Sequence, residues 1–148
     1  VLRAAAYLHD IAVPLDKARH YELGARLARG LLGETGASQK ETEAIVHAIE
    51  AHSRYGGPDP QTLEARVLYD ADTVEFVGAI GLARGIVRAM ESGDYRSDVR
   101  QLPALVDRMI AQVEGLQHTE QGAAMADGRI AWLREYKARL EAELRGDL

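Results

Sequence analysis

The chain opens with the stretch VLRAAAYLHD (residues 1–10), in which a run of strong helix formers ends in a histidine–aspartate pair. No N-cap residue precedes this run, so we expect a helix that is already in progress at residue 1 and a chain that starts inside a domain. Pro14 disfavours helical geometry at the residue before it, which predicts that the helix ends near Ala12. The pair His9-Asp10 is therefore expected at the end of a helix.

The rest of the sequence also predicts helices joined by loops. Sustained alternation of apolar and polar residues is absent, whereas Ala, Leu, Arg and Glu are abundant, which indicates an all-α protein. The predicted helices cover residues 16–32, 38–52, 62–91, 98–114 and 119–144, and glycines at 78, 81 and 85 indicate either close helix contacts or a break within the third of these. We expect about six helices in one domain over residues 1–148.

Composition narrows the possible functions. The 148 residues include no cysteine, which excludes disulfides, thiolate metal sites and cysteine nucleophiles. A net charge of -5 disfavours non-specific binding to nucleic acid, and no apolar run reaches the roughly 20 residues that a membrane span needs. We therefore expect a cytoplasmic protein that does not enter membranes and that holds any anionic substrate through local charges.

Histidines are concentrated in the first third of the chain. Four of the five histidines precede residue 53, one of them next to an aspartate, and two further aspartates follow; the set is His9, Asp10, His20, His47, His52, Asp70 and Asp72. A metal ion that activates water needs neutral imidazole and ionised carboxylate ligands, and without cysteine this set is the one available source. The pattern indicates a divalent ion, with Mn, Mg, Co, Ni, Fe and Zn all compatible.

Four segments carry a family resemblance: LHDIA (8–12), RHYELG (19–24), IVHAIEAHS (45–53) and LYDAD (68–72). In order and spacing they resemble the HD superfamily of metal-dependent phosphohydrolases, and most closely the small bacterial HD proteins. The string GAIGLAR (78–84) and the final predicted helix are similar to that subgroup as well. The resemblance implies a helical bundle that binds a divalent ion and hydrolyses phosphate esters or anhydrides.

The resemblance also implies roles for single residues. His9, Asp10 and Asp72 correspond to metal ligands, while the first histidine of the family would lie on a helix before His9. We therefore expect the HD-type domain to lack that helix. His20 and His52 correspond to histidines that hold a second ion in some members, and binding of substrate phosphate or capping of a helix is the alternative for each.

Helical geometry separates two pairs of neighbouring candidates. His47 and His52 lie roughly 140° apart around a helix, so both are not expected to reach one ion, and we favour His52. Asp70 and Asp72 face different ways, and the resemblance selects Asp72, which leaves Asp70 as a solvated carboxylate or one that supports a ligand. Glu75 shares a face with Asp72 and could orient a ligand, or could be a surface charge.

The expected reaction is attack of a metal-activated water on phosphorus. Asp10 would bind the metal and position the nucleophile, and His20 or His52 would assist the leaving oxygen. The expected substrate is a nucleotide or another small phosphorylated metabolite. Its phosphate would need cationic partners, for which the candidates nearest the motifs are Lys17, Arg19 and Arg84.

Two other functions are compatible with the same residues. Some HD proteins use such a set to hold two irons that activate oxygen, so an HD-type di-iron oxygenase is one alternative. The other is a helical interaction module without catalysis, and a homodimer is compatible with either reading. The sequence alone does not separate these alternatives from hydrolysis.

Overall fold

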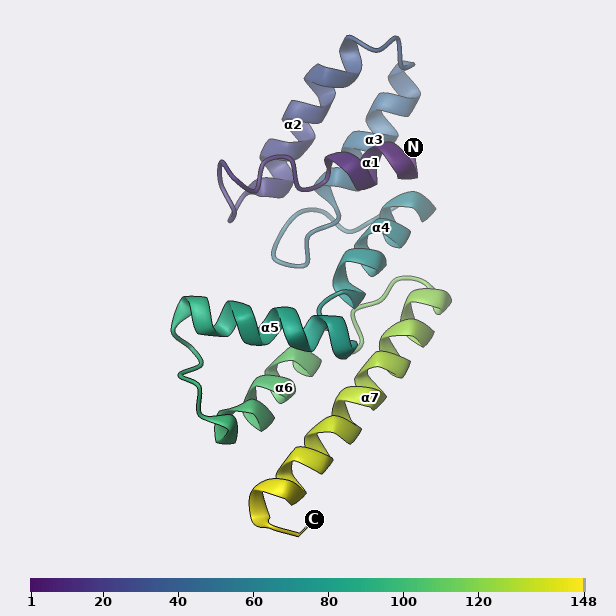
Figure 1. Ribbon diagram of the computed structural model, residues 1–148. Coiled ribbons are helices and arrows are strands. Elements are labelled where there is room, and N and C mark those ends of the chain that lie inside the picture. The colour runs from purple at the N-terminus through teal and green to yellow at the C-terminus, as the bar shows by residue number, and fades with distance from the viewer. Residues whose placement is uncertain (148) are drawn as a thin grey trace. The chain divides into compact units, whose positions relative to one another are not determined.

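The computed structural model describes residues 1–147, and the regular elements of this part of the chain are helices joined by turns and loops (Figure 1). It contains seven α-helices and one short 3-10 helix, without a strand among the described residues, which confirms the predicted all-α class. The chain divides into two compact units, which we call unit 1 (residues 1–72) and unit 2 (from Thr73 onward). Each unit has a core of its own.

Unit 1 is built on helix α3. It comprises α1 (Leu2–Leu8), α2 (His20–Gly33), α3 (Gln39–Glu50) and all but the last two residues of α4 (Leu63–Val74), with α1 and α2 both packed against α3. The core is rich in alanine, which lets helix backbones approach closely; its members are Ala5, Ala25, Ala28, Leu32, Ile45, Val46, Ala48, Ile49, Ala51, Ala65 and Leu68. These small side chains consequently allow close packing of α1 and α2 on α3.

The segment between α1 and α2 differs from the sequence prediction. Helix α1 ends at Leu8, and residues 9–15 form successive turns in which amide groups bond to the carbonyl three residues earlier, such as Val13 N–H to Asp10 O. Helix α2 begins at His20 rather than near Asp16. The reason is local: the Asp16 carboxylate accepts hydrogen bonds from the backbone N–H groups of Ala18 and Arg19, which favours a turn over a helix.

Helix α3 begins with the capping box that its sequence predicts. The Ser38 hydroxyl accepts the Glu41 backbone N–H at 3.3 Å, and the Glu41 carboxylate accepts the Ser38 N–H at 3.0 Å. Two amide groups that the helix itself cannot bond are therefore satisfied.

Unit 2 consists of α5 (Gly78–Ser92), the 3-10 helix η1 (Val99–Gln101), α6 (Leu102–Ala111) and α7 (Glu120–Arg145). The expected break between α4 and α5 falls at residues 75–77, and Gly78 follows it with a φ of 81° that side chains rarely tolerate. Helices α5 and α6 pack on each other and on α7, around a core that includes Val106, Val113 and Leu133.

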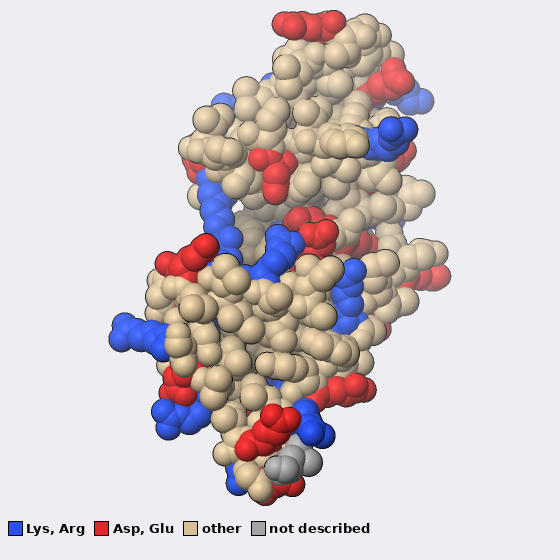
Figure 2. Space-filling model, in the orientation of Figure 1, with Lys and Arg blue, Asp and Glu red and all other residues tan. Residues whose placement is uncertain are grey.

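Crossing a membrane and binding nucleic acid each depend on a general property of the molecule, the first on helix composition and the second on surface charge. Among residues 1–147, no helix combines the length and the apolar character that crossing a membrane requires. On the face drawn in Figure 2, basic side chains are interspersed with acidic ones. This mixture agrees with the net charge of -5.

Replacing Ser38 with alanine should destabilise unit 1, because the Glu41 N–H at the start of α3 would lose its acceptor. We expect the free energy of unfolding to fall by about 1 kcal/mol. Urea denaturation followed by circular dichroism measures this change. Ser38→Thr keeps a hydroxyl at the cap and should retain most of the stability, and an equal loss in both variants would contradict the capping account.

Candidate metal centre

Three histidines of unit 1 are oriented in the same way. In each ring, Nδ1 lies within hydrogen-bond distance of the backbone carbonyl three residues earlier: 2.8 Å from Ala6 for His9, 2.8 Å from Lys17 for His20, and 2.5 Å from Ile49 for His52. A carbonyl oxygen can only accept, so Nδ1 must carry the proton in all three rings. The neutral ring then presents the lone pair of Nε2, which is the form that binds metals.

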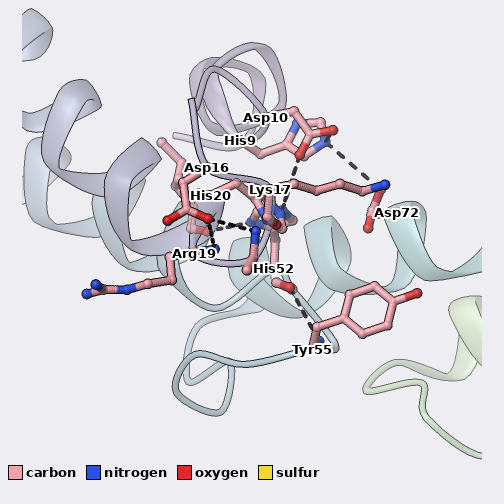
Figure 3. A network of polar contacts seen from close by, with 12 residues as sticks. His9, Asp10, Asp16, Lys17, Arg19, His20, His52, Tyr55 and Asp72 are labelled. Atoms are coloured by element: carbon pink, nitrogen blue, oxygen red, sulfur yellow. Dashed lines mark hydrogen bonds and ion pairs between the residues drawn. The ribbon is translucent and has the colours of Figure 1, made fainter. Parts of the chain in front are cut away.

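The three Nε2 atoms point toward one another and toward two carboxylates (Figure 3). His20 Nε2 and His52 Nε2 are 3.1 Å apart, and each lies 3.6 Å from Asp10 Oδ1. His9 Nε2 lies 3.6 Å from Asp10 Oδ2 and 4.0 Å from Asp72 Oδ1. We call these five residues the His/Asp cluster. The side chains of His9, Asp10 and Asp72 thus meet although 62 positions separate Asp10 from Asp72.

The spacing within the cluster fits ligands that surround a cation. Bonds of about 2.0 to 2.2 Å place neighbouring ligand atoms roughly 3 to 4.4 Å apart. The ligand atoms of His9, Asp10 and His52 all lie within 4.8 Å of one another. The donor chemistry fits as well, because two neutral rings that face each other through Nε2 lone pairs cannot hydrogen-bond, whereas a cation attracts both.

Burial within the cluster is uneven. The His52 side chain is 1% exposed, whereas that of Asp10 is 55% exposed. Burial lowers the pKa of His52 from 6.5 to about 4, with the neighbouring His9 and His20 acting in the same direction against the opposing effects of the Ile49 carbonyl and Asp10. His52 is therefore neutral at pH 7 and keeps its Nε2 lone pair.

Each cluster residue lies at or near the end of a helix. His9 and Asp10 follow α1, His20 is the first residue of α2, His52 follows α3 by two positions, and Asp72 lies in the last turn of α4. The arrangement follows from the packing of α1 and α2 on α3, because their ends meet. Four separate segments thus contribute one or two candidate ligands each.

The three cationic candidates are placed differently. Lys17 lies in the turn before α2, and its side chain is drawn across the cluster in Figure 3. Arg19 points away from the histidines in the same view, and its Nε donates to Glu22 Oε2 at 3.1 Å. Arg84 belongs to unit 2, where its guanidinium pairs with the exposed Glu75 at 2.7 Å. Among the three, Lys17 contacts the cluster, through its carbonyl oxygen 2.8 Å from His20 Nδ1.

Two residues outside the cluster clarify the choices made from helical geometry. His47 Nε2 accepts the backbone N–H of Gln61 at 3.0 Å, so this ring ties α3 to the segment before α4. Asp70 is 3% exposed, which excludes the solvated carboxylate that was one of its two expected states. Asp72, in contrast, has a side chain that is 31% exposed and approaches His9.

The loop after His52 packs closely against α2 and the end of α3, which its sequence alone does not indicate. A Cβ atom on Gly56 would overlap the ring of Tyr21, and one on Gly57 would overlap the Glu50 carbonyl oxygen. Gly57 also has a φ of 96°. The adjacent glycines were recognisable as turn formers, but their contact with Tyr21 at the start of α2 depends on the tertiary fold.

Comparison with known proteins agrees with this architecture. A sequence model described as "HD domain" matches residues 1–76. The uncharacterized protein YpgQ from Bacillus subtilis (strain 168) is 21% identical over 151 residues, which cover 99% of this chain and 73% of YpgQ.

Two solved structures are similar in fold. A Lactobacillus plantarum structural genomics target aligns with a TM-score of 0.63 and 22% identity over 96% of this chain and 74% of its own. The crystal structure of Bacillus subtilis YpgQ in complex with ADP aligns with a TM-score of 0.55 and 20% identity, over 96% of this chain and 84% of its own.

Replacing Asp72 with asparagine should weaken Mn²⁺ binding by at least about tenfold, because a charged oxygen beside His9 is lost without a change of shape. Replacing Asp70 with asparagine, only two positions away, should leave most of the affinity. Calorimetric titration measures both, with circular dichroism to verify folding because Asp70 is buried. Equal losses in two folded variants would contradict the assignment of Asp72.

Proposed function

The chain belongs to the HD-domain family, and from this premise we propose that it is a metal-dependent phosphohydrolase acting on a nucleotide or another small phosphorylated metabolite. The observation that carries the proposal is the convergence of three Nε2 atoms on Asp10, each ring held in the tautomer that leaves Nε2 unprotonated. The choice of a nucleotide as substrate is supported further by the crystal structure of the similar protein YpgQ in complex with ADP.

We propose that His9, Asp10, His52 and Asp72 hold the divalent ion. A bound divalent ion supplies Lewis acidity toward water and toward a phosphoryl oxygen. Asp10 is the most exposed of these carboxylates, so its second oxygen is the group best placed to orient an attacking water. Lys17 would contact the substrate phosphate, and Arg19 and Arg84 are retained as weaker candidates for that contact.

His20 has two mutually exclusive roles. As a ligand it would share Asp10 and His52 with a second ion, since these three residues form another triangle of 3.1 to 3.6 Å. As a proton donor to the leaving oxygen it would need its Nε2 free of metal and carrying a second ring proton, while Nδ1–H stays bonded to the Lys17 carbonyl. We favour the second role for His20, because the ring of His52 is almost completely buried and is less able to reach a substrate.

The proposal is tested by release of phosphate or pyrophosphate from nucleotides and generic phosphoesters with Mn²⁺, Mg²⁺ or Co²⁺. We expect turnover that requires the metal and that a chelator abolishes. Two irons per chain with an oxygen-dependent spectrum would instead favour the oxygenase, and absence of turnover with all metals would favour an interaction module.

Two histidines near the end of α3 provide a matched pair of variants. His52→Gln should lower kcat/KM by about 100-fold or more, because a buried ligand is lost. His47→Gln should change it by no more than about threefold, since His47 Nε2 bonds to the Gln61 backbone rather than to the cluster. Steady-state kinetics with a common metal concentration measure both, and similar losses would contradict the proposed site.

A further inference from the structure

We infer that Asp16 is a positioning residue of the metal centre, which it serves by building the turn that fixes the tautomer and direction of the His20 ring. The inference rests on the proposed function in one respect, namely that the oriented ring serves a metal centre. Asp16 acts on the cluster through two sets of hydrogen bonds, one within the turn and one from the turn to the His20 ring.

The first step is the turn. Asp16 Oδ1 accepts the backbone N–H of Ala18 at 2.9 Å and that of Arg19 at 3.1 Å. One carboxylate oxygen therefore fixes the backbone from residue 16 to residue 19, immediately before α2. This arrangement delays the start of the helix to His20.

The second step joins the turn to the ring. Lys17 lies inside the turn, and its carbonyl oxygen accepts the Nδ1–H of His20 at 2.8 Å. With the proton on Nδ1, the Nε2 lone pair of His20 faces His52 at 3.1 Å and Asp10 at 3.6 Å. Rotation of the Lys17 peptide would remove the acceptor and allow the other tautomer, whose proton on Nε2 would face His52 and Asp10 and compete with the ion for their lone pairs.

His9 and His52 show why His20 needs this support. Their acceptors, the carbonyls of Ala6 and Ile49, belong to α1 and α3, whose regular hydrogen bonding already fixes their direction. Lys17 lies outside every helix of the described chain, so its carbonyl has no such framework. The side chain of Asp16 supplies the constraint that a helix supplies to the other two.

Asp16 could instead serve only to stabilise the start of α2. Stability and tautomer are separate observables, and they distinguish the two readings. A residue that merely caps the helix would lower the melting temperature while leaving the protonation site of every histidine ring unchanged. A positioning residue would change the His20 ring specifically, with His9 and His52 as internal controls.

The experiment is long-range ¹H–¹⁵N NMR of the histidine rings in the 148-residue chain at pH 8, after removal of metal with a chelator. In the unmodified protein we expect the proton on Nδ1 in His9, His20 and His52. In Asp16→Ala we expect His20 to become a mixture of tautomers while the other two rings keep theirs. Mn²⁺ affinity, measured by titration of the same samples, should fall by about tenfold.

Three further variants keep the test decisive. Asp16→Asn retains an oxygen acceptor at the same distance and should restore the His20 tautomer and most of the affinity. Asp16→Glu keeps the charge but moves the oxygen, so it should resemble Asp16→Ala. Ser38→Ala removes the cap of α3 and should lower stability without changing any of the three rings.

The inference is overturned if His20 keeps its Nδ1 proton in Asp16→Ala, or if Asp16→Asn fails to restore it in a folded protein. The tautomers are measured without substrate or turnover. Absence of phosphatase activity in the unmodified chain would therefore count against the proposed function, while the NMR result would still decide the role of Asp16.

Discussion

The candidate centre depends on one interaction that occurs three times, the hydrogen bond from a histidine Nδ1 to the carbonyl three residues before it. This bond fixes both the tautomer and the plane of the ring, so that Nε2 presents a lone pair in a defined direction. It requires a backbone that turns like a helix just before the histidine. The centre therefore lies where helices begin and end rather than in their interiors.

Close packing in unit 1 brings these helix ends together. Alanines at the contacts of α1 and α2 with α3 let the backbones approach, and Gly24 of α2 does the same beside the turn after α1. A Cβ atom at Gly24 would lie only 3.2 Å from the His9 carbonyl oxygen. Small residues in the core thus set the distances between rings that come from separate segments.

The sequence was sufficient for the helical class, for the capping box at Ser38 and for the residue types of the site, because these depend on local pattern and composition. The family resemblance selected His9, Asp10 and Asp72. It assigned His52, with His20, to a second ion, and it did not reveal that a ligand atom of His52 lies within 4.8 Å of one of His9, since a separation of 43 positions carries no geometry without the tertiary fold. The late start of α2 escaped prediction because a side chain, Asp16, competes with helix formation there.

The uneven burial of the cluster limits what can approach it. His52 closes the inner side, while Asp10 exposes more than half of its side chain, so a substrate would approach from the side of Asp10. The whole chain carries a net charge of -5, so an anionic substrate gains little from long-range attraction. In the proposed site, binding would then depend on short-range contacts with the ion and with Lys17. A small substrate that concentrates its charge in one phosphate group satisfies this condition better than an extended polyanion, whose outlying charges would be repelled by the net negative charge of the chain.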